Sequence, residues 1–165
     1  MIARPVSSDR LPKPVGPYSP GMILDRLVFV SGQGATDPVS GILVEGGVAA
    51  QTEQCLKNIA AILEAAGSSL QHVLRCGVFL IDISEFQEMN GAYQRAFGSH
   101  RPARTTVQAA ALPGTGLRVE IDAVAFIPDE GDRRDPGGLS TGRSGRSGRS
   151  AAPWISRHQS CNLGG

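Results

Sequence analysis

The 165-residue chain is long enough for one well-packed domain and too short for two, and 41% of its residues are hydrophobic. Its apolar runs are broken within about ten residues, far short of the roughly 20 that cross a bilayer, and its N-terminus has no apolar signal segment. The three cysteines, Cys55, Cys76 and Cys161, form no C-x-x-C pair or Cys/His cluster, which argues against a disulfide framework or a zinc site. We therefore expect a soluble, cytoplasmic protein without a bound metal.

The formal net charge of +1 is unevenly distributed along the chain. Residues 131–165 hold six Arg and two Asp, a net charge of +4, which leaves about −3 for residues 1–130. The C-terminal segment is rich in Gly, Ser and Arg and nearly free of large apolar residues, a composition typical of disorder. We predict a folded domain over 1–130 and an extension over 131–165, which is disordered or acts as a basic arm for RNA or membranes. The mildly acidic domain makes nucleic acid an unlikely general partner.

The first predicted elements are a hairpin and a helix. The apolar run 27–32 can pair with residues 21–26 through a tight turn around Asp25. Apolar side chains then recur at helical spacing over 48–66, and Gly67 follows as a stop signal. This pattern predicts an amphipathic helix after the hairpin.

A strand and a second helix follow. Residues 72–81 are typical of a strand, and Ser84 with Gln87 forms a capping-box pattern that opens a helix ending at Gly98. The apolar face of this helix consists of Phe86, Met89, Tyr93 and Phe97. These residues are expected to pack the helix onto the strand.

Two strands, 103–111 and 117–127, complete a β-β-α-β-α-β-β order in an α+β domain with a mixed sheet. Two helices can cover only one face of such a sheet. On the last strand, however, Ile121 points to one face while Val124 and Phe126 point to the other. The uncovered face needs a partner, and a closed homo-oligomer is the simplest one.

Two groups near this face could carry chemistry. Period-two alternation places Glu120 and Asp122 on the uncovered face, where partial burial would raise a carboxyl pKa toward values useful for proton transfer. The alternative is a carboxylate held by a nearby Lys or Arg. Arg104 follows Pro102 at a strand start, so its guanidinium is expected near the sheet end, within one turn's reach of the same face. There it could bind a carboxylate through two hydrogen bonds or form a structural ion pair.

Four blocks of sequence resemble one known family in their order and spacing. They are GPYSP (16–20), FVSGQ (29–33), MNGAYQRAF (89–97) and RPARTTVQAAALPGTGLRVEIDAVA (101–125). The last block is the most specific, because it combines Pro-Ala-Arg, a Leu-Pro turn and a hydrophobic-Glu-Ile strand. The chain is thereby identified as similar to the YjgF/RidA family.

The resemblance implies a fold and an activity. Family members have chorismate-mutase-like α+β domains with two helices on one face of the sheet, and they assemble as homotrimers with clefts between subunits. The implied activity is hydrolytic deamination of enamine and imine acids, such as 2-iminobutanoate and 2-iminopropanoate, to 2-ketoacids and ammonia, without a metal or organic cofactor. The alternatives are a related hydrolase for another enamine, such as aminoacrylate, and a non-catalytic trimer that binds RNA or protein.

The resemblance also implies roles for particular residues. Arg104 would hold the substrate carboxylate, and Glu120 would orient or activate a water. The substrate-binding positions are Tyr18, Ser31, Gly32, Asn90, Arg104 and Thr106. Two departures from the family pattern could shift specificity: Pro20 replaces a common Gln and removes a backbone donor, and Thr106 stands where many members have Cys.

Overall fold

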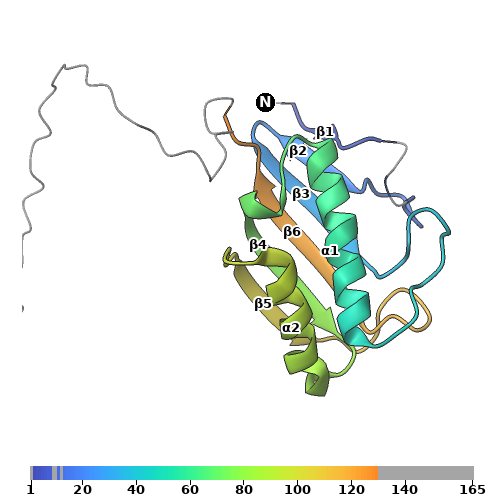
Figure 1. Ribbon diagram of the computed structural model, residues 1–165. Helices are drawn as coiled ribbons and strands as arrows, with labels where there is room; N and C mark the ends of the chain where they lie inside the picture. The colour runs from blue at the N-terminus through green and yellow to red at the C-terminus, as the bar shows by residue number, and fades with distance from the viewer. Residues whose placement is uncertain (1, 9–10, 12, 130–165) are drawn as a thin grey trace, which may run out of the picture. The chain divides into compact units, whose positions relative to one another are not determined.

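One mixed sheet forms the centre of the computed structural model, which describes residues 2–8, 11 and 13–129 (Figure 1). Its strands are β1 (Arg4–Pro5), β2 (Gly21–Leu24), β3 (Leu27–Gln33), β4 (Val73–Leu80), β5 (Ala103–Gln108) and β6 (Val119–Phe126). They are hydrogen-bonded in the order β1-β2-β3-β6-β4-β5, and only β4 and β5 run parallel. The mixed sheet is confirmed, and β1 is an additional strand that the sequence pattern does not predict. The predicted extension over 131–165 lies outside the described residues.

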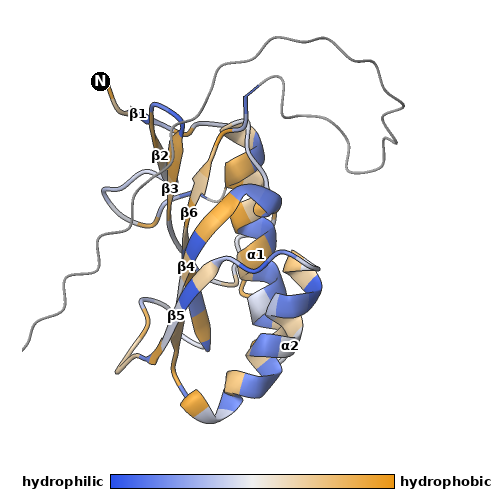
Figure 2. Cartoon of the chain, turned by 90° about the vertical axis from the view of Figure 1, so that its left-hand side faces the viewer, coloured by the Kyte–Doolittle hydropathy of each residue, from blue (hydrophilic) through white to orange (hydrophobic). Residues whose placement is uncertain are grey.

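Both helices lie on the same face of the sheet, as predicted (Figure 2). They are α1 (Val48–Ala65) and α2 (Phe86–Phe97). Cys55, Ile59 and Ile62 of α1 are fully buried, and burial of each Ile stabilises the fold by roughly 1.5–3 kcal/mol. Gly67 ends α1 with a φ of 83°, a left-handed conformation that glycine adopts without strain. Within the described residues, no helix has the length and apolar character to cross a membrane.

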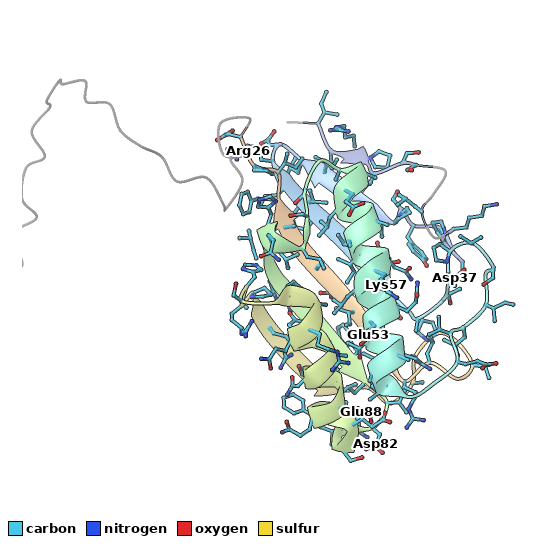
Figure 3. All side chains as sticks on the ribbon, viewed as in Figure 1. Arg26, Asp37, Glu53, Lys57, Asp82 and Glu88 are labelled. Carbon is cyan, nitrogen blue, oxygen red and sulfur yellow. The ribbon has the colours of Figure 1, made fainter. Side chains whose placement is uncertain are left out.

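The start of α2 differs from the predicted capping box. A short 3-10 helix, η2 (Ile83–Glu85), precedes α2, and the Asp82 carboxylate accepts the backbone N–H of Ser84 at 2.8 Å. Asp82 lies beside the beginning of α2 in Figure 3. The prediction that Ser84 and Gln87 cap the helix is wrong, because the short Asp82 side chain closes a local turn on the N–H two residues further on.

Side chains of β6 alternate between the two faces of the sheet. Val119, Ile121 and Ala123 are buried beneath the helices, whereas Glu120 and Val124 are only half-buried on the opposite face. The helix-covered face therefore contains the core, and the opposite face remains open in a single chain. This confirms the predicted difference between the faces.

A β-bulge interrupts the pairing of β3 with β6. Val30 pairs with Ala123, but the next pair joins Gln33 to Ile121, so β3 contains one extra residue in this interval. Bulges bend a strand locally and change the direction of its side chains. This bulge contains Ser31 and Gly32, two of the predicted substrate-binding residues.

Candidate active site

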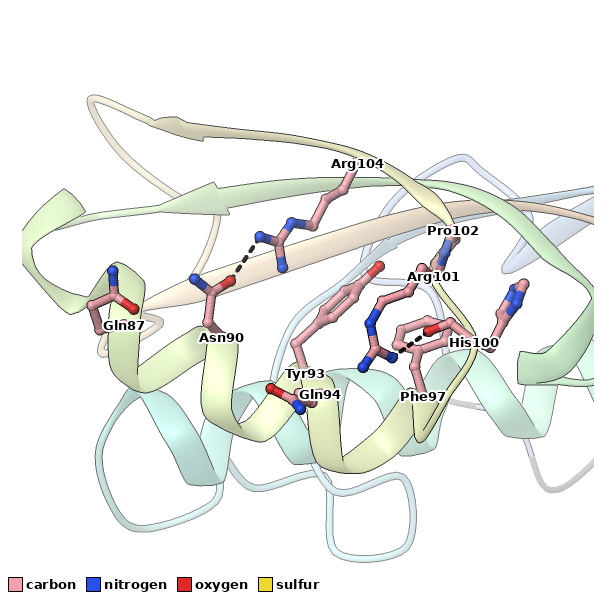
Figure 4. A pocket seen from close by; sticks show the side chains of 9 residues that line it. All are labelled: Gln87, Asn90, Tyr93, Gln94, Phe97, His100, Arg101, Pro102 and Arg104. Atoms are coloured by element: carbon pink, nitrogen blue, oxygen red, sulfur yellow. Dashed lines mark hydrogen bonds between the residues drawn. The ribbon is translucent and has the colours of Figure 1, made fainter.

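Arg104 is held between β5 and α2. It pairs with the buried Cys76 of β4, which directs its side chain to the helix-covered face. Its Nη2 donates a hydrogen bond to Asn90 Oδ1 at 2.7 Å (Figure 4). The guanidinium carbon lies 4.7 Å from the Tyr93 ring centroid and 5.6 Å from that of Phe86. Two aromatic rings and one amide therefore orient the guanidinium before any ligand binds.

A pocket of about 470 Å³ opens around Arg104 (Figure 4). It is lined by Gln87, Asn90, Tyr93, Gln94, Phe97, His100, Arg101, Pro102 and Arg104. None of these residues is acidic, and no carboxylate of the described residues lies within 4.0 Å of Arg104. Arg104 therefore forms no ion pair with another described residue, and its guanidinium is available to bind an anion.

Two buried hydroxyl groups lie on the same side of the sheet. The hydroxyl oxygens of Thr106 and Tyr93 are both buried: that of Thr106 has no hydrogen-bond partner among the described residues, and that of Tyr93 has the Cys76 thiol as its neighbour. Thr106 follows Arg104 by two positions in β5, so the two side chains share a face. Burial raises the pKa of Tyr93 above its ordinary value, so this hydroxyl stays protonated.

Glu120 lies on the open face of the sheet, near the bulge in β3. Gly32 lies so close that a Cβ added there would be 2.9 Å from Glu120 Cδ, so any larger residue would force the carboxylate to move. Burial raises the pKa of Glu120, and the negative charge of Asp122 raises it further. A carboxylate with a raised pKa is a stronger base than an ordinary Glu and is better suited to accept a proton.

Asp122 has partners that Glu120 lacks. Its Oδ1 accepts the backbone N–H of Gly77 at 2.8 Å and lies 3.5 Å from Arg75 Nη1. Glu120 has no Lys or Arg within 4.0 Å in the described part of the chain. The structural alternative considered for both carboxylates therefore holds for Asp122 and not for Glu120.

The loop before β2 brings Tyr18 to the same region as Glu120. Tyr18 and Gly32 line a second pocket of about 550 Å³ together with Glu120. Ser31 fixes this loop, because its hydroxyl donates to the Ser19 carbonyl at 2.7 Å and its N–H donates to the Pro20 carbonyl at 3.0 Å. Pro20 thus still takes part in the loop as a hydrogen-bond acceptor.

The predicted site residues fall into two groups. Arg104, Asn90 and Thr106 lie on the helix-covered side, whereas Tyr18, Gly32 and Glu120 lie around the second pocket. The prediction that Arg104 reaches the face of Glu120 is wrong for a single chain. Pairing with β4 directs Arg104 to the face opposite to that of Glu120.

The apolar pattern of the sequence predicts Tyr93 and Phe86 on the buried face of α2, but it does not indicate their contact with Arg104. Tyr93 follows Asn90 by three positions, one helical turn, so both side chains can reach the same guanidinium. Helical spacing was the signal that could have identified Tyr93. The contact of Tyr93 with Arg104 depends on the pairing of β5 with β4, which directs Arg104 toward α2.

The fold and these two groups define a class of protein. It is a small α+β domain with an oriented arginine for an anionic group and a carboxyl group whose raised pKa suits proton transfer. Among the described residues, no cluster of three or more His, Cys, Asp or Glu side chains could hold a metal ion.

The chain belongs to the YjgF/RidA family, whose model, described as Endoribonuclease L-PSP, matches residues 8–127. It is 46% identical to human 2-iminobutanoate/2-iminopropanoate deaminase over 126 residues, which are 76% of this chain and 91% of the human protein. It resembles the crystal structure of RidA from Psychrobacter sp. at 40% identity and a TM-score of 0.71, covering 75% of this chain and 99% of that one. It also resembles E. coli TdcF with bound serine at 34% identity and a TM-score of 0.70, covering 74% of this chain and 98% of TdcF.

Proposed function

We propose that this protein hydrolyses small 2-imino acids, such as 2-iminobutanoate and 2-iminopropanoate, to 2-ketoacids and ammonia. The observation that carries the proposal is the guanidinium of Arg104, which Asn90 and two aromatic rings orient and which no carboxylate of the described residues neutralises. The 46% identity with the human deaminase supports the same reaction. Enamine tautomers enter this reaction once a proton has been added to carbon.

Arg104 holds the substrate carboxylate in this proposal. Its Nη2 donates one of its two N–H groups to Asn90, and no described residue uses the remaining N–H groups, so the second Nη2 N–H can pair with Nε or Nη1 along one edge to bind a carboxylate through two hydrogen bonds. Holding the substrate by this group fixes the position of the imine carbon and reduces the entropy lost in reaching the transition state. The Thr106 hydroxyl, buried without a partner in the described chain, is a further donor for the bound acid.

Glu120 supplies the proton transfers. Water adds to the carbon of the protonated imine as the ionised Glu120 accepts a proton from it, and this gives a tetrahedral amino alcohol. Glu120 then returns the proton to nitrogen. As the C–N bond breaks, the ionised Glu120 takes the hydroxyl proton, the C=O bond of the ketoacid forms, and the ammonia that leaves carries this proton away as ammonium. The reaction consumes one water and involves no oxidation or reduction.

The separation of the two groups leads us to propose that each site is shared between two copies of the chain in a homotrimer. The open face carries large apolar side chains that are about 40% exposed, with values of 39% for Leu27, 43% for Phe29 and 42% for Val107. A second copy that covers this face removes apolar surface from water and can bring its own Arg104 to Glu120. The YjgF/RidA resemblance supports the trimer, and Tyr18 and Gly32 belong to the half of the site that contains Glu120.

The test couples a dehydratase to this protein. Threonine dehydratase generates 2-iminobutanoate, and imine decay is measured by trapping the remaining imine with semicarbazide. Replacing Arg104 with Ala removes two charge-assisted hydrogen bonds, so kcat/KM is expected to fall on the order of a hundredfold or more. Arg104→Lys keeps the charge but loses the fork, and an intermediate activity is expected.

The matched control is Arg95→Ala, because Arg95 is an exposed arginine of α2 that pairs with Glu53 outside the pocket. Its activity should equal that of the wild type. If Arg104→Ala decomposes the imine at the wild-type rate, the proposed function is wrong.

One structural relative supports the proposal that the substrate is small. TdcF was solved with bound serine, a three-carbon amino acid with the same carboxylate and adjacent nitrogen as a small imino acid. Rates on 2-iminobutanoate, 2-iminopropanoate and aminoacrylate, measured side by side, would rank these substrates.

We also propose that the protein works in the cytoplasm and that nucleic acid is not its partner. Cys55 and Cys76 are free and buried, which suits a reducing compartment. Cell fractionation tests the first proposal. Retention of the full-length protein on single-stranded RNA at low salt would contradict the second.

A further inference from the structure

Arg101 and Arg104 stand out among the arginines because they line one pocket without a neutralising carboxylate. Four other arginines have an acidic partner: Arg26 pairs with Asp129, Arg75 with Asp122, Arg95 with Glu53 and Arg118 with Glu85. Neither pocket arginine has a carboxylate within 4.0 Å in the described part of the chain. The pocket thus concentrates two positive charges with no acidic lining residue.

The position of Arg101 is fixed by the loop that follows α2. Its Nη1 donates to the backbone carbonyls of Gly98 and His100, the latter at 2.8 Å. Nε and Nη2 have no hydrogen-bond partner among the described residues. In Figure 4 the Tyr93 ring is drawn between the guanidinium groups of Arg101 and Arg104. Arg101 therefore presents unused donors at a distance from the Arg104 anion site.

The rest of the pocket is polar. Gln87, Gln94 and His100 line it together with the two arginines, and about 470 Å³ is far more space than one carboxylate occupies. Arg101 is exposed, so a substrate with a purely alkyl side chain would leave its free donors to water, whereas a charged side chain could bind them. A second carboxylate on the substrate would satisfy Arg101 and relieve the repulsion between the two guanidinium groups.

We propose that Arg101 is a specificity-determining residue that binds a side-chain carboxylate and favours 2-imino dicarboxylic acids, such as iminosuccinate and 2-iminoglutarate. This inference rests on the proposed imine hydrolysis and extends its substrate class. Arg104 holds the carboxylate next to the imine carbon, and Arg101 holds the one at the end of the side chain. The reaction is unchanged: water replaces C=N with C=O, ammonia leaves, and the second carboxylate takes no part in bond making or breaking.

The experiment compares kcat/KM for iminosuccinate with kcat/KM for 2-iminobutanoate, using the full-length protein. An aspartate oxidase generates the first imine and threonine dehydratase the second, and semicarbazide trapping follows both. The variants are Arg101→Gln, which removes the charge, and Arg101→Lys, which keeps the charge but lacks the Nη1 group that donates to the loop carbonyls. Arg95→Gln removes the same charge from α2 outside the pocket.

The wild type and Arg101→Lys should have a higher kcat/KM for iminosuccinate than for 2-iminobutanoate. Arg101→Gln should lower the ratio of these two kcat/KM values on the order of fivefold, mainly by raising KM for iminosuccinate. Arg95→Gln should leave the ratio unchanged. An equal loss on both substrates in Arg101→Gln would mean that Arg101 only supports the loop or shares the first carboxylate, and it would overturn the inference. An unchanged ratio would overturn it too. If the wild type hydrolyses neither imine, the proposed function fails, and the inference fails with it.

Discussion

The two faces of the central sheet differ in what they contain and in what they lack. The helix-covered face has an oriented Arg104 and two buried hydroxyl groups, but no carboxylate lines its pocket. The open face has Glu120 with a raised pKa beside Gly32, and Glu120 has no Lys or Arg partner in the described chain. Among the described residues, the helix-covered pocket thus has a group that can bind an anion but no carboxylate to accept a proton, and Glu120 can accept a proton but has no Lys or Arg beside it to bind an anion.

This difference supports the proposal that neither pocket of a single chain holds the complete site. An arginine and a carboxylate that met within one chain would neutralise each other as an ion pair. Placed on opposite faces, both remain available to a ligand until a second copy brings them together. In the proposed trimer, the second copy would complete the site as well as cover apolar surface.

The largest effect is expected from Phe29→Asp on the open face. A charge placed where the second copy would pack is buried without a partner, which costs roughly 3 kcal/mol or more at each interface. The assembly should dissociate and imine hydrolysis should be lost, as measured by sedimentation velocity and imine decay. Ile2→Asp is the control, because Ile2 is 89% exposed and lines neither pocket. A trimeric and active Phe29→Asp would refute the role of this face.

Glu120→Gln tests the carboxylate of the open face. The substitution removes the proton acceptor, so kcat/KM should fall on the order of a hundredfold. In the wild type, Glu120 must be ionised, so the rate should fall as pH decreases through its pKa. That acidic limb should lie above the usual Glu range, because burial and Asp122 raise the pKa. Glu64→Gln, on the exposed side of α1, should keep the wild-type profile. A limb that persists in Glu120→Gln would assign it to another group.

Gly32→Ala tests the close approach between the bulge and Glu120. The added Cβ would lie 2.9 Å from Glu120 Cδ, so the carboxylate must move, and activity should fall about tenfold while the fold remains. Gly91→Ala is the matched control, because its Cβ would meet only Arg95 Nη1 at 3.5 Å. This control should retain activity and gain about 0.5–1 kcal/mol of stability, since alanine favours the helix. Equal activity of the two variants would show that the position of Glu120 is not critical.

The smallest effect is expected from Asp122→Asn. The amide oxygen can still accept the Gly77 N–H, but the negative charge that raises the pKa of Glu120 is removed. The acidic limb of the pH–rate profile should therefore move to lower pH, with little change in the rate above it. A limb that stays in place or moves to higher pH would contradict this electrostatic coupling.

Most of the fold could be predicted because hydrophobic periodicity and the residues that form turns and end helices are local features of the sequence. The hairpin around Asp25 and the helix that ends at Gly67 are confirmed at nearly the predicted bounds. The strand β1 was missed because two residues, one of them proline, show no periodicity. The residue that caps the start of α2 was predicted wrongly because Asp and Ser are both common at helix starts. The backbone of this segment brings the Ser84 N–H to the Asp82 carboxylate, and the sequence pattern does not show this.

The candidate site could be predicted only in part. Alternation along β5 places Arg104 and Thr106 on one side of the strand. Which face that side belongs to depends on the parallel pairing with β4, a contact between segments far apart in the sequence. The roles of Arg104, Glu120 and the cleft residues stay predictions that the experiments above examine.

The most direct test of the shared site mixes two inactive proteins. Arg104→Ala and Glu120→Gln chains are co-expressed with different tags, and trimers that contain both are purified. If each site takes Arg104 from one copy and Glu120 from the next, every mixed trimer has one intact site, and about a third of the wild-type activity returns. If both residues act within the same chain, the mixed trimers stay as inactive as either parent, and the account is contradicted.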